Sequence, residues 1–169
     1  MFGTFLGCLW SIARVFVRAA AGRQRFNVLG AWNAVTRQLL AVTNTTVVNT
    51  DTMCDLLRVI AAAGLTGPVT VVLDNARYQR NKVVQALAVE LSIRLLFLPS
   101  YSPNLNLIER LWGFAKRQSV YGKYHPTFAA FRAAIEATLS GIPTTHAGRL
   151  KTLMTLRFQQ FDDVSLLGG

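Results

Sequence analysis

The chain has 169 residues, 51% of them hydrophobic, and its 18 Lys and Arg against 8 Asp and Glu give a net charge of +10 at pH 7. This length and apolar content suit one folded domain with its own core and exclude an intrinsically disordered chain. The cationic excess is typical of proteins that bind polyanions such as nucleic acid, and the alternative is a merely basic soluble protein.

The cysteines and the apolar start of the chain bear on the redox compartment of the protein and on whether it has a signal peptide or a membrane helix. Cys8 and Cys54 form no CxxC pattern, which argues against a disulfide scaffold or a zinc site and fits a reducing cytoplasm. Residues 1–21 are apolar and end in three alanines, as in a signal peptide, but they lack a basic first segment, and Arg14 and Arg18 interrupt them. No apolar run reaches the roughly 18 residues that a membrane helix requires. We therefore expect no membrane partner, and we expect the first residues to be part of the fold.

The first part of the chain has the pattern of several strands followed by one helix. A strand, a bend, the two strands of a hairpin and a helix are predicted, in chain order, at residues 10–17, 22–25, 26–35, 38–48 and 49–63. Thr36 and Arg37 separate the two hairpin strands, and Asn49 stands where a helix would start.

The second part alternates helices with strands. A strand, a helix, a strand, three helices and a frayed tail are predicted at residues 69–73, 81–91, 92–98, 107–118, 128–139, 148–161 and 162–169. The run Val69 to Leu73 is continuously apolar, as in a strand buried on both faces. The strand, helix and strand at residues 69–98, with their short connections, imply a right-handed parallel crossover. Further along the chain, Pro143 is expected to end the helix predicted at 128–139. Together these elements predict a mixed α/β sheet.

Two carboxylates occupy the ends of the stretch from Val69 to Glu109. Asp74 follows the apolar run and Glu109 opens an amphipathic helix, with 34 residues, positions 75 to 108, between them. In open α/β sheets, functional groups gather beyond the carboxyl ends of strands, where Asp74 is predicted to lie. Each acid also has a purely structural interpretation. Asp74 with Asn75 suits a turn, and Glu109 suits a capping box that starts at Asn106.

Two motifs in this stretch point to a known family. The motif at 73–77, LDNAR, and the string at 98–112, LPSYSPNLNLIERLW, resemble the DDE superfamily transposases of the IS630/Tc1-mariner type. The 34-residue gap matches the spacing of that group's second and third acidic residues, and residues 22–31 resemble its second-strand region. The resemblance covers residues 1–139. It implies an α/β, ribonuclease H-like mixed sheet flanked by helices, with the first strand incomplete, and a transposase of an insertion sequence as the function.

The resemblance also implies a chemistry for the two acids. Asp74 and Glu109 would be the catalytic residues, and each would help to bind one of two Mg²⁺ or Mn²⁺ ions. Two such ions about 4 Å apart can activate the attacking oxygen and stabilise the leaving one in DNA cleavage and strand transfer, and Mg²⁺ prefers oxygen ligands. Asn75 and Arg77 would border the site. Gln79 stands where many relatives have His, so we assign it no catalytic role.

The family pattern requires a third carboxylate, an Asp on the first strand, which this chain lacks. No acidic residue precedes Asp51, and both Asp51 and Asp55 fall on a predicted helix, which is the wrong element. We therefore expect an N-terminally truncated catalytic domain at residues 1–142, without the usual helix-turn-helix DNA-binding region, followed by a C-terminal helix and tail at residues 143–169. With two of three ligands, metal affinity and catalysis should be severely reduced.

Basic side chains accompany both acids along the sequence. The DNA-binding candidates are Asn75, Arg77, Arg80, Lys82, Arg110, Lys116 and Arg117. If the two acids meet, these residues would surround them, as a DNA backbone requires, and the alternative is a solvated cationic face. Trp32 and Trp112 are expected in the core rather than as platforms for bases. His125 and His146 lack the spacing of metal ligands and are expected at the surface or in structural roles.

Three functions stay open on the sequence alone. The first is a DDE transposase domain that acts on transposon ends and target DNA, defective here and able to assemble as a homo-oligomer. The second is a non-catalytic DNA-binding or dimerisation remnant of a transposase. The third is another ribonuclease H-like nuclease that acts on RNA or a hybrid, against which the string from Tyr101 to Trp112 argues.

Overall fold

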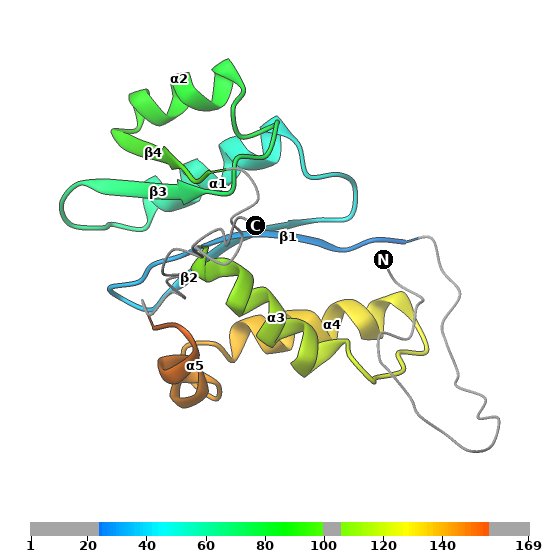
Figure 1. Cartoon of the computed structure of the whole chain (residues 1–169). Helices are drawn as coiled ribbons and strands as arrows, with labels where there is room; N and C mark the ends of the chain where they lie inside the picture. Colours follow the sequence, from blue (N-terminus) through cyan, green and yellow to red (C-terminus); the bar gives the residue numbers. More distant parts are fainter. Residues whose placement is uncertain (1–23, 100–105, 156–169) are drawn as a thin grey trace, which may run out of the picture.

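The computed structural model describes residues 24–99 and 106–155, which form strands and helices in two groups on either side of a hairpin (Figure 1). The elements are, in chain order, β1 (Asn27–Trp32), β2 (Leu39–Asn44), α1 (Thr50–Ala62), β3 (Val69–Leu73), α2 (Lys82–Glu90), β4 (Ile93–Phe97), α3 (Leu107–Ser119), α4 (Phe128–Ser140) and α5 (Ala147–Leu153). The strand predicted at 10–17, most of the bend at 22–25 and the tail at 162–169 lie outside the described residues.

β1 and β2 form the predicted hairpin. They pair antiparallel, with Asn27 opposite Asn44 and Trp32 opposite Leu39. The connecting loop is longer than the sequence pattern suggested, because the side chain of Asn33 accepts hydrogen bonds from the amides of Val35 and Thr36, at 2.9 and 3.0 Å. A polar side chain that bonds the backbone two and three residues ahead starts a turn early and so shortens the strand.

The two faces of this hairpin contact two different hydrophobic clusters. Leu29, Ala31, Leu40 and Val42 pack against the cluster built on α1, whereas Trp32 and Leu39 pack against the cluster built on α3. The alternation follows from the two-residue period of side chains along a strand. The hairpin therefore separates a group of α1, α2, β3 and β4 from a group of α3, α4 and α5 (Figure 1).

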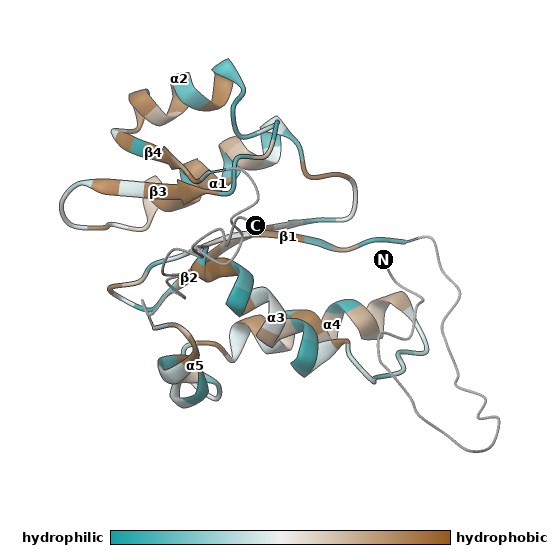
Figure 2. Cartoon of the chain, in the orientation of Figure 1, coloured by the Kyte–Doolittle hydropathy of each residue, from teal (hydrophilic) through white to brown (hydrophobic). Residues whose placement is uncertain are grey.

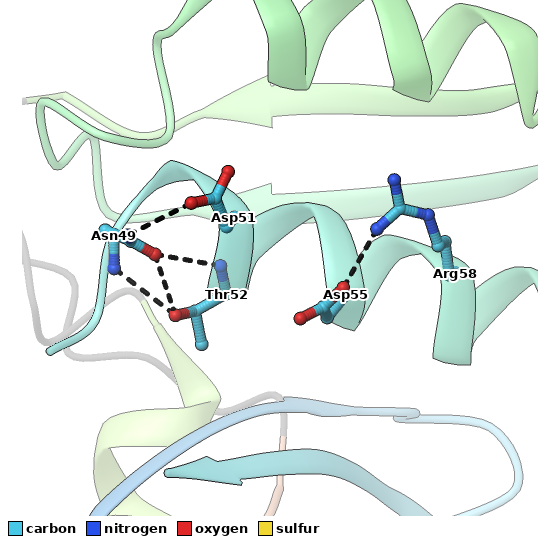
Figure 3. Close-up of polar contacts among 5 residues, drawn as sticks. All are labelled: Asn49, Asp51, Thr52, Asp55 and Arg58. Carbon is cyan, nitrogen blue, oxygen red and sulfur yellow. Dashed lines mark hydrogen bonds and ion pairs between the residues drawn. The ribbon is translucent and has the colours of Figure 1, made fainter. Parts of the chain in front are cut away.

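Helix α1 begins as the sequence predicts, with a polar cap. The side chain of Asn49 accepts a hydrogen bond from the amide of Thr52, and the Thr52 hydroxyl accepts one from the amide of Asn49, which closes a capping box (Figure 3). The exposed ion pair of Arg58 with Asp55 lies one turn further on, at 2.9 Å. Met53 and Leu57, fully buried on the inner face, anchor the helix in the first cluster.

β3 and β4 pair in parallel, with Val69 opposite Ile93 and Leu73 opposite Phe97, and α2 connects them. The prediction that β3 is buried on both faces is wrong for the described structure. Val71 and Leu73 are buried, but Val72 is 42% exposed. The helices α1 and α2 pack on one face of this two-stranded sheet, and an apolar run does not reveal how many of its faces will be covered.

Helices α3, α4 and α5 build the second cluster around Leu111, Phe114, Ile142 and Leu150. Helix α4 ends at Ser140, one residue after the predicted span of 128–139, and the chain turns at Gly141. Helix α5 begins at Ala147 and ends at Leu153, earlier than the predicted span to 161, of which residues 156–161 lie outside the described residues.

The fold is a mixed α/β arrangement of two short sheets flanked by five helices in the described residues, consistent with a ribonuclease H-like fold. Figure 2 shows hydrophobic residues along much of β3 and β4 and on parts of the helices. Across residues 24–99 and 106–155, no helix combines the length and the apolar character that crossing a membrane would take.

Candidate active site

Asp74 lies where the sequence places it, directly after β3. The amide of Leu98 donates to the carbonyl of Leu73 at 2.8 Å, which extends the parallel ladder by one step beyond β4. Asp74 is therefore the first residue past the paired end of the sheet. Its side chain is exposed and makes no hydrogen bond or ion pair with another described residue. Its carboxylate oxygens are thus open to a ligand at the carboxyl edge of a parallel pair.

The turn that follows Asp74 is held by side chains. Asn75 has a φ of +76°, in the left-handed region that Asn tolerates better than most residues. Its side-chain oxygen accepts a hydrogen bond from Nε of Arg80. The Arg80 guanidinium also lies over the ring of Phe97, with 5.3 Å between its central carbon and the ring centroid. Arg80 therefore ties the turn to the end of β4.

Gln79 fixes the same turn from inside. It is 5% exposed, and its side-chain oxygen accepts a hydrogen bond from the amide of Ala76 at 3.0 Å. The amide of Gln79 donates in return to the carbonyl of Ala76, at 3.0 Å. Gln79 thus has a structural role in this turn.

The pKa of Tyr78 is affected by the charge of Asp74. Burial of the ring raises the pKa of the Tyr78 hydroxyl, the negative charge of Asp74 raises it further, and a hydrogen bond with Gln79 lowers it in part. Both effects that raise the pKa disfavour the phenolate. Tyr78 is thus close enough to Asp74 for the two charges to interact.

Three predicted DNA-binding residues meet in one shallow groove. Arg77, Arg80 and Lys82 line it together with Tyr78, Asn81 and the residues that begin α1, Val48, Asn49 and Thr50. Its volume is about 790 Å³. The groove brings three cationic side chains together, and such a cluster attracts a polyanion.

Glu109 lies in the first turn of α3, after the N-cap Asn106. The Asn106 side chain accepts from the amide of Ile108 at 3.3 Å. The Glu109 carboxylate is exposed and forms no hydrogen bond with Asn106 or with any other described residue. The reciprocal half of a capping box is therefore not formed, and the carboxylate is available for another partner.

The basic residues of α3 divide into two kinds. Nη1 of Arg110 donates to the carbonyl of Thr155 at 2.8 Å and lies 3.5 Å from the carbonyl of Leu153, so its guanidinium joins α3 to the end of α5. Lys116 and Arg117 are exposed in the last turn of α3. There they also interact favourably with the negative end of the helix dipole.

The two acids belong to the two groups on either side of the hairpin. In the view of Figure 1, α3 begins beneath the carboxyl ends of β3 and β4, across β1. Within residues 24–99 and 106–155, no three His, Cys, Asp or Glu side chains are grouped to hold a metal ion. Asp74 and Glu109 each present an exposed carboxylate, which is the type of oxygen ligand that Mg²⁺ binds in proteins.

The other aromatic and imidazole side chains take structural roles, as predicted. The ring of Trp112 lies against Gly30 of β1, and Trp32 packs on the second cluster. The ring of His125 donates from Nε2 to the carbonyl of Ser119 at 2.7 Å. His146 meets Phe114 edge to face, at 5.2 Å between ring centroids.

The sequence pattern did not point to Tyr78 or to the start of α1. Tyr78 could have been noticed as an aromatic residue four positions after Asp74. Asn49 and Thr50 reach the groove only because α1 and α2 pack together, and no local signal marks that contact.

The comparison with known families agrees with these observations. The sequence profile described as DDE superfamily endonuclease matches residues 13–132, more than half of the chain, which include Asp74 and Glu109. A search of curated proteins found no match. The family implies DNA cleavage of the transposase kind, and its members typically use divalent metal ions. With a carboxylate at the end of β3, a second one in the first turn of α3 and this match over both, the chain belongs to the DDE superfamily endonucleases.

Proposed function

We propose that this chain is the catalytic domain of a transposase of the IS630/Tc1-mariner type, acting on transposon ends and target DNA with Mg²⁺ or Mn²⁺. The observation that carries the proposal is Asp74, exposed and unpaired among the described residues at the carboxyl end of a parallel strand, inside a DDE family match. The motif from Asn106 to Trp112 supports the subtype.

In this proposal Asp74 would help to hold one metal ion and Glu109 the other. Such ions would supply activation of the attacking water or hydroxyl and stabilisation of the departing oxygen. Asn75, Arg80 and Gln79 keep the turn in the shape that aims Asp74 outward. Arg77 and Lys82 offer positive charge to the phosphates beside it.

We further propose that these 169 residues alone catalyse poorly. The described residues contain no group of three His, Cys, Asp or Glu side chains that could hold a metal ion, whereas the family pattern uses three carboxylates, and no acidic residue precedes Asp51. The same observation favours a second candidate, a DNA-binding remnant without catalysis that occupies transposon ends. Metal binding by Asp74 and Glu109 separates the two candidates.

The experiment is nicking of supercoiled plasmid by the purified chain in Mn²⁺, together with Mn²⁺ binding followed by electron paramagnetic resonance. We expect weak binding, lowered at least about tenfold by Asp74→Asn and by Glu109→Gln, and slow nicking that both variants abolish. Asp55→Asn and Glu90→Gln, which neutralise exposed acids on α1 and α2, are the matched controls and should change neither.

Three outcomes decide between these statements. Fast nicking that Asp74→Asn abolishes would show that the chain is not defective. DNA binding without Mn²⁺ binding would favour the non-catalytic remnant. Mn²⁺ binding and nicking that are unchanged in both variants would remove Asp74 and Glu109 from the site.

A further inference from the structure

Helix α3 turns one face away from the core, and Glu109 lies on that face. Its buried residues are Leu111, Phe114, Ala115 and Ser119. At about 100° per residue, Glu109, Gly113 and Lys116 fall within roughly 60° of one another on the opposite side. Glu109 and Lys116 are exposed, and so is Arg117 at the border of this face. These residues form a continuous stripe that the core does not use.

Gly113 leaves the middle of this stripe bare. A Cβ added there would meet only Nη1 of Arg117, at 3.8 Å, which is an ordinary contact. Apart from this guanidinium, no other atom lies within 4 Å of the added Cβ, so Gly113 faces little but the flexible Arg117 side chain. A long polymer can approach the helix backbone closely between the acid and the base, which is a common use of glycine.

The turn that follows α3 carries two exposed aromatic rings. Tyr121 is 42% exposed and Tyr124 is 49% exposed. The amide of Tyr121 donates to the carbonyl of Lys116 at 2.8 Å, and the amide of Lys123 donates to the carbonyl of Val120 at 3.2 Å. Among the described residues, neither tyrosine ring is stacked on another ring or on a cation. The turn is thus ordered by its own hydrogen bonds and presents flat, unpartnered surfaces.

The charge of this region limits what can cover it. The 26 residues from Arg110 to Ile135 contain five Lys or Arg and no Asp or Glu. A second copy of the chain, also at +10, would be repelled. Cations that alternate with exposed tyrosines fit a single nucleic-acid strand, whose phosphates pair with the cations and whose bases stack on the rings. Figure 2 shows hydrophilic residues at the far end of α3 and a hydrophobic start of the helix.

We propose that these residues bind a DNA strand with unpaired bases and lead it to Glu109. The residues of this α3 strip are Glu109, Gly113, Lys116, Arg117, Tyr121, Lys123 and Tyr124. The inference rests on the proposed function, because in that function Glu109 is the metal ligand beside the reacting phosphate. At 1.5 Å per residue, Ser119 lies roughly 15 Å along the axis from Glu109. A stacked strand advances about 3.4 Å per nucleotide, so the tyrosines contact bases roughly five nucleotides from the reacting phosphate.

The test measures Kd for a short fluorescent oligothymidine by anisotropy, with the full chain, at low salt and in EDTA. Lys116→Gln should raise Kd several-fold and flatten its salt dependence. Tyr121→Ser should raise Kd about fivefold or more, because stacking on one ring is lost, whereas Tyr121→Phe should leave Kd unchanged. Arg94→Gln, which removes one exposed charge from β4, is the matched control and should have little effect.

The variant Gly113→Gln tests the same proposal independently. Its side chain fits the folded helix, so circular dichroism should stay unchanged while Kd rises, since the strand can no longer approach. Duplex DNA of the same length should bind more weakly and should not respond to Tyr121→Ser. The proposal is overturned if Lys116→Gln, Gly113→Gln and Tyr121→Ser change Kd no more than Arg94→Gln does, or if duplex DNA shows the same tyrosine dependence.

This test separates the strip from the proposed function. EDTA removes metal ions, so the oligonucleotide assay measures binding without the proposed metal site, whereas nicking requires that site. If strip variants weaken binding while no metal binding is found, the strip stands and the catalytic proposal fails. If metal binding is found and strip variants bind normally, the strip fails and the catalytic proposal stands.

Discussion

The turn from Asp74 to Arg80 depends on three side chains that each constrain the backbone. Asn75 adopts a left-handed conformation, which costs an L-residue about 1–2 kcal/mol unless its side chain compensates locally. Its hydrogen bond from Arg80 and the bond of Gln79 to the Ala76 amide supply that compensation. The strained residue therefore sits beside the proposed metal ligand, where a defined backbone direction is needed.

Tyr78 gives a pH prediction at this scale. Its pKa is raised above the usual 10 in the folded chain, by burial first and by the charge of Asp74 second. The folded state therefore binds the phenol proton more tightly than the unfolded state does. The stability that Tyr78 contributes is present below pH 10 and is lost as the pH rises through the higher, folded pKa.

Asp74→Asn should lower the pKa of Tyr78, because it removes the neighbouring negative charge. Ultraviolet absorbance of the phenolate, titrated upward from pH 9 and taken as the difference from Tyr78→Phe, measures it. Asp55→Asn is the control and should leave the titration unchanged. An unshifted Tyr78 in Asp74→Asn would place the carboxylate away from the ring.

Local signals at the scale of single residues predicted where the two acids lie along the elements but not which side chains their neighbours contact. The LDNAR motif indicated Asp74, and Arg80 was expected to contact DNA. In the structure the Arg80 guanidinium already contacts Asn75 and Phe97. Phe97 comes 17 positions later in the chain, so only the pairing of β4 with β3 could bring the two side chains together.

At the scale of elements, boundaries followed short-range chemistry. Asn49, Asn81, Asn106 and Thr127 each cap the helix that follows them, and those helices start within a residue of the predicted positions. A cap works over three residues, so sequence pattern alone reveals it. The exposure of Val72 was not predicted, because the cover on each face of a strand comes from distant elements.

Replacing a glycine by alanine should have opposite effects on stability at two positions, one in β1 and one in α3. A Cβ at Gly30 of β1 would lie 3.0 Å from Leu39 Cδ1 and from Trp112 Cη2, whereas one at Gly113 of α3 meets no close atom. Gly30→Ala should destabilise the fold by about 1–3 kcal/mol, through overpacking. Gly113→Ala should stabilise it by up to about 1 kcal/mol, through helix propensity.

Urea unfolding of both glycine variants, followed by circular dichroism, measures the difference. Because each variant adds the same methyl group, each serves as the control for the other. Equal effects of the two substitutions would mean that Trp112 does not pack closely on β1.

At the scale of the whole molecule, charge and packing are divided between the two sides of the β1–β2 hairpin. The first cluster gathers α1, α2, β3 and β4, and the second gathers α3 and the residues around α5. Asp74 belongs to the first side and Glu109 to the second. Relative movement of the two sides would therefore change the distance between the proposed metal ligands.

Arg110 links α3 to the end of α5, and this link can be tested. Its guanidinium bonds to the carbonyl of Thr155, 45 residues away. Arg110→Gln should loosen α5, because the last carbonyls of the helix lose a charged donor worth about 1.5–3 kcal/mol.

Hydrogen exchange followed by mass spectrometry should show faster exchange over residues 147–153 in Arg110→Gln. Arg58→Gln, which breaks only the local pair with Asp55, should leave these amides unchanged. Unaltered exchange in Arg110→Gln would mean that packing of Leu150 alone holds α5.

The sequence by itself determined the order of the described elements, the caps of the helices and the two acids with their family motif, since all of these depend on neighbouring residues. Only the tertiary structure decided that Arg77, Arg80 and Lys82 share a groove with the start of α1, that Arg110 is tied to α5, and that Gly113 opens the outer face of α3. These features require residues that are distant in sequence to pack together, and packing depends on the shape of the whole core rather than on any one segment.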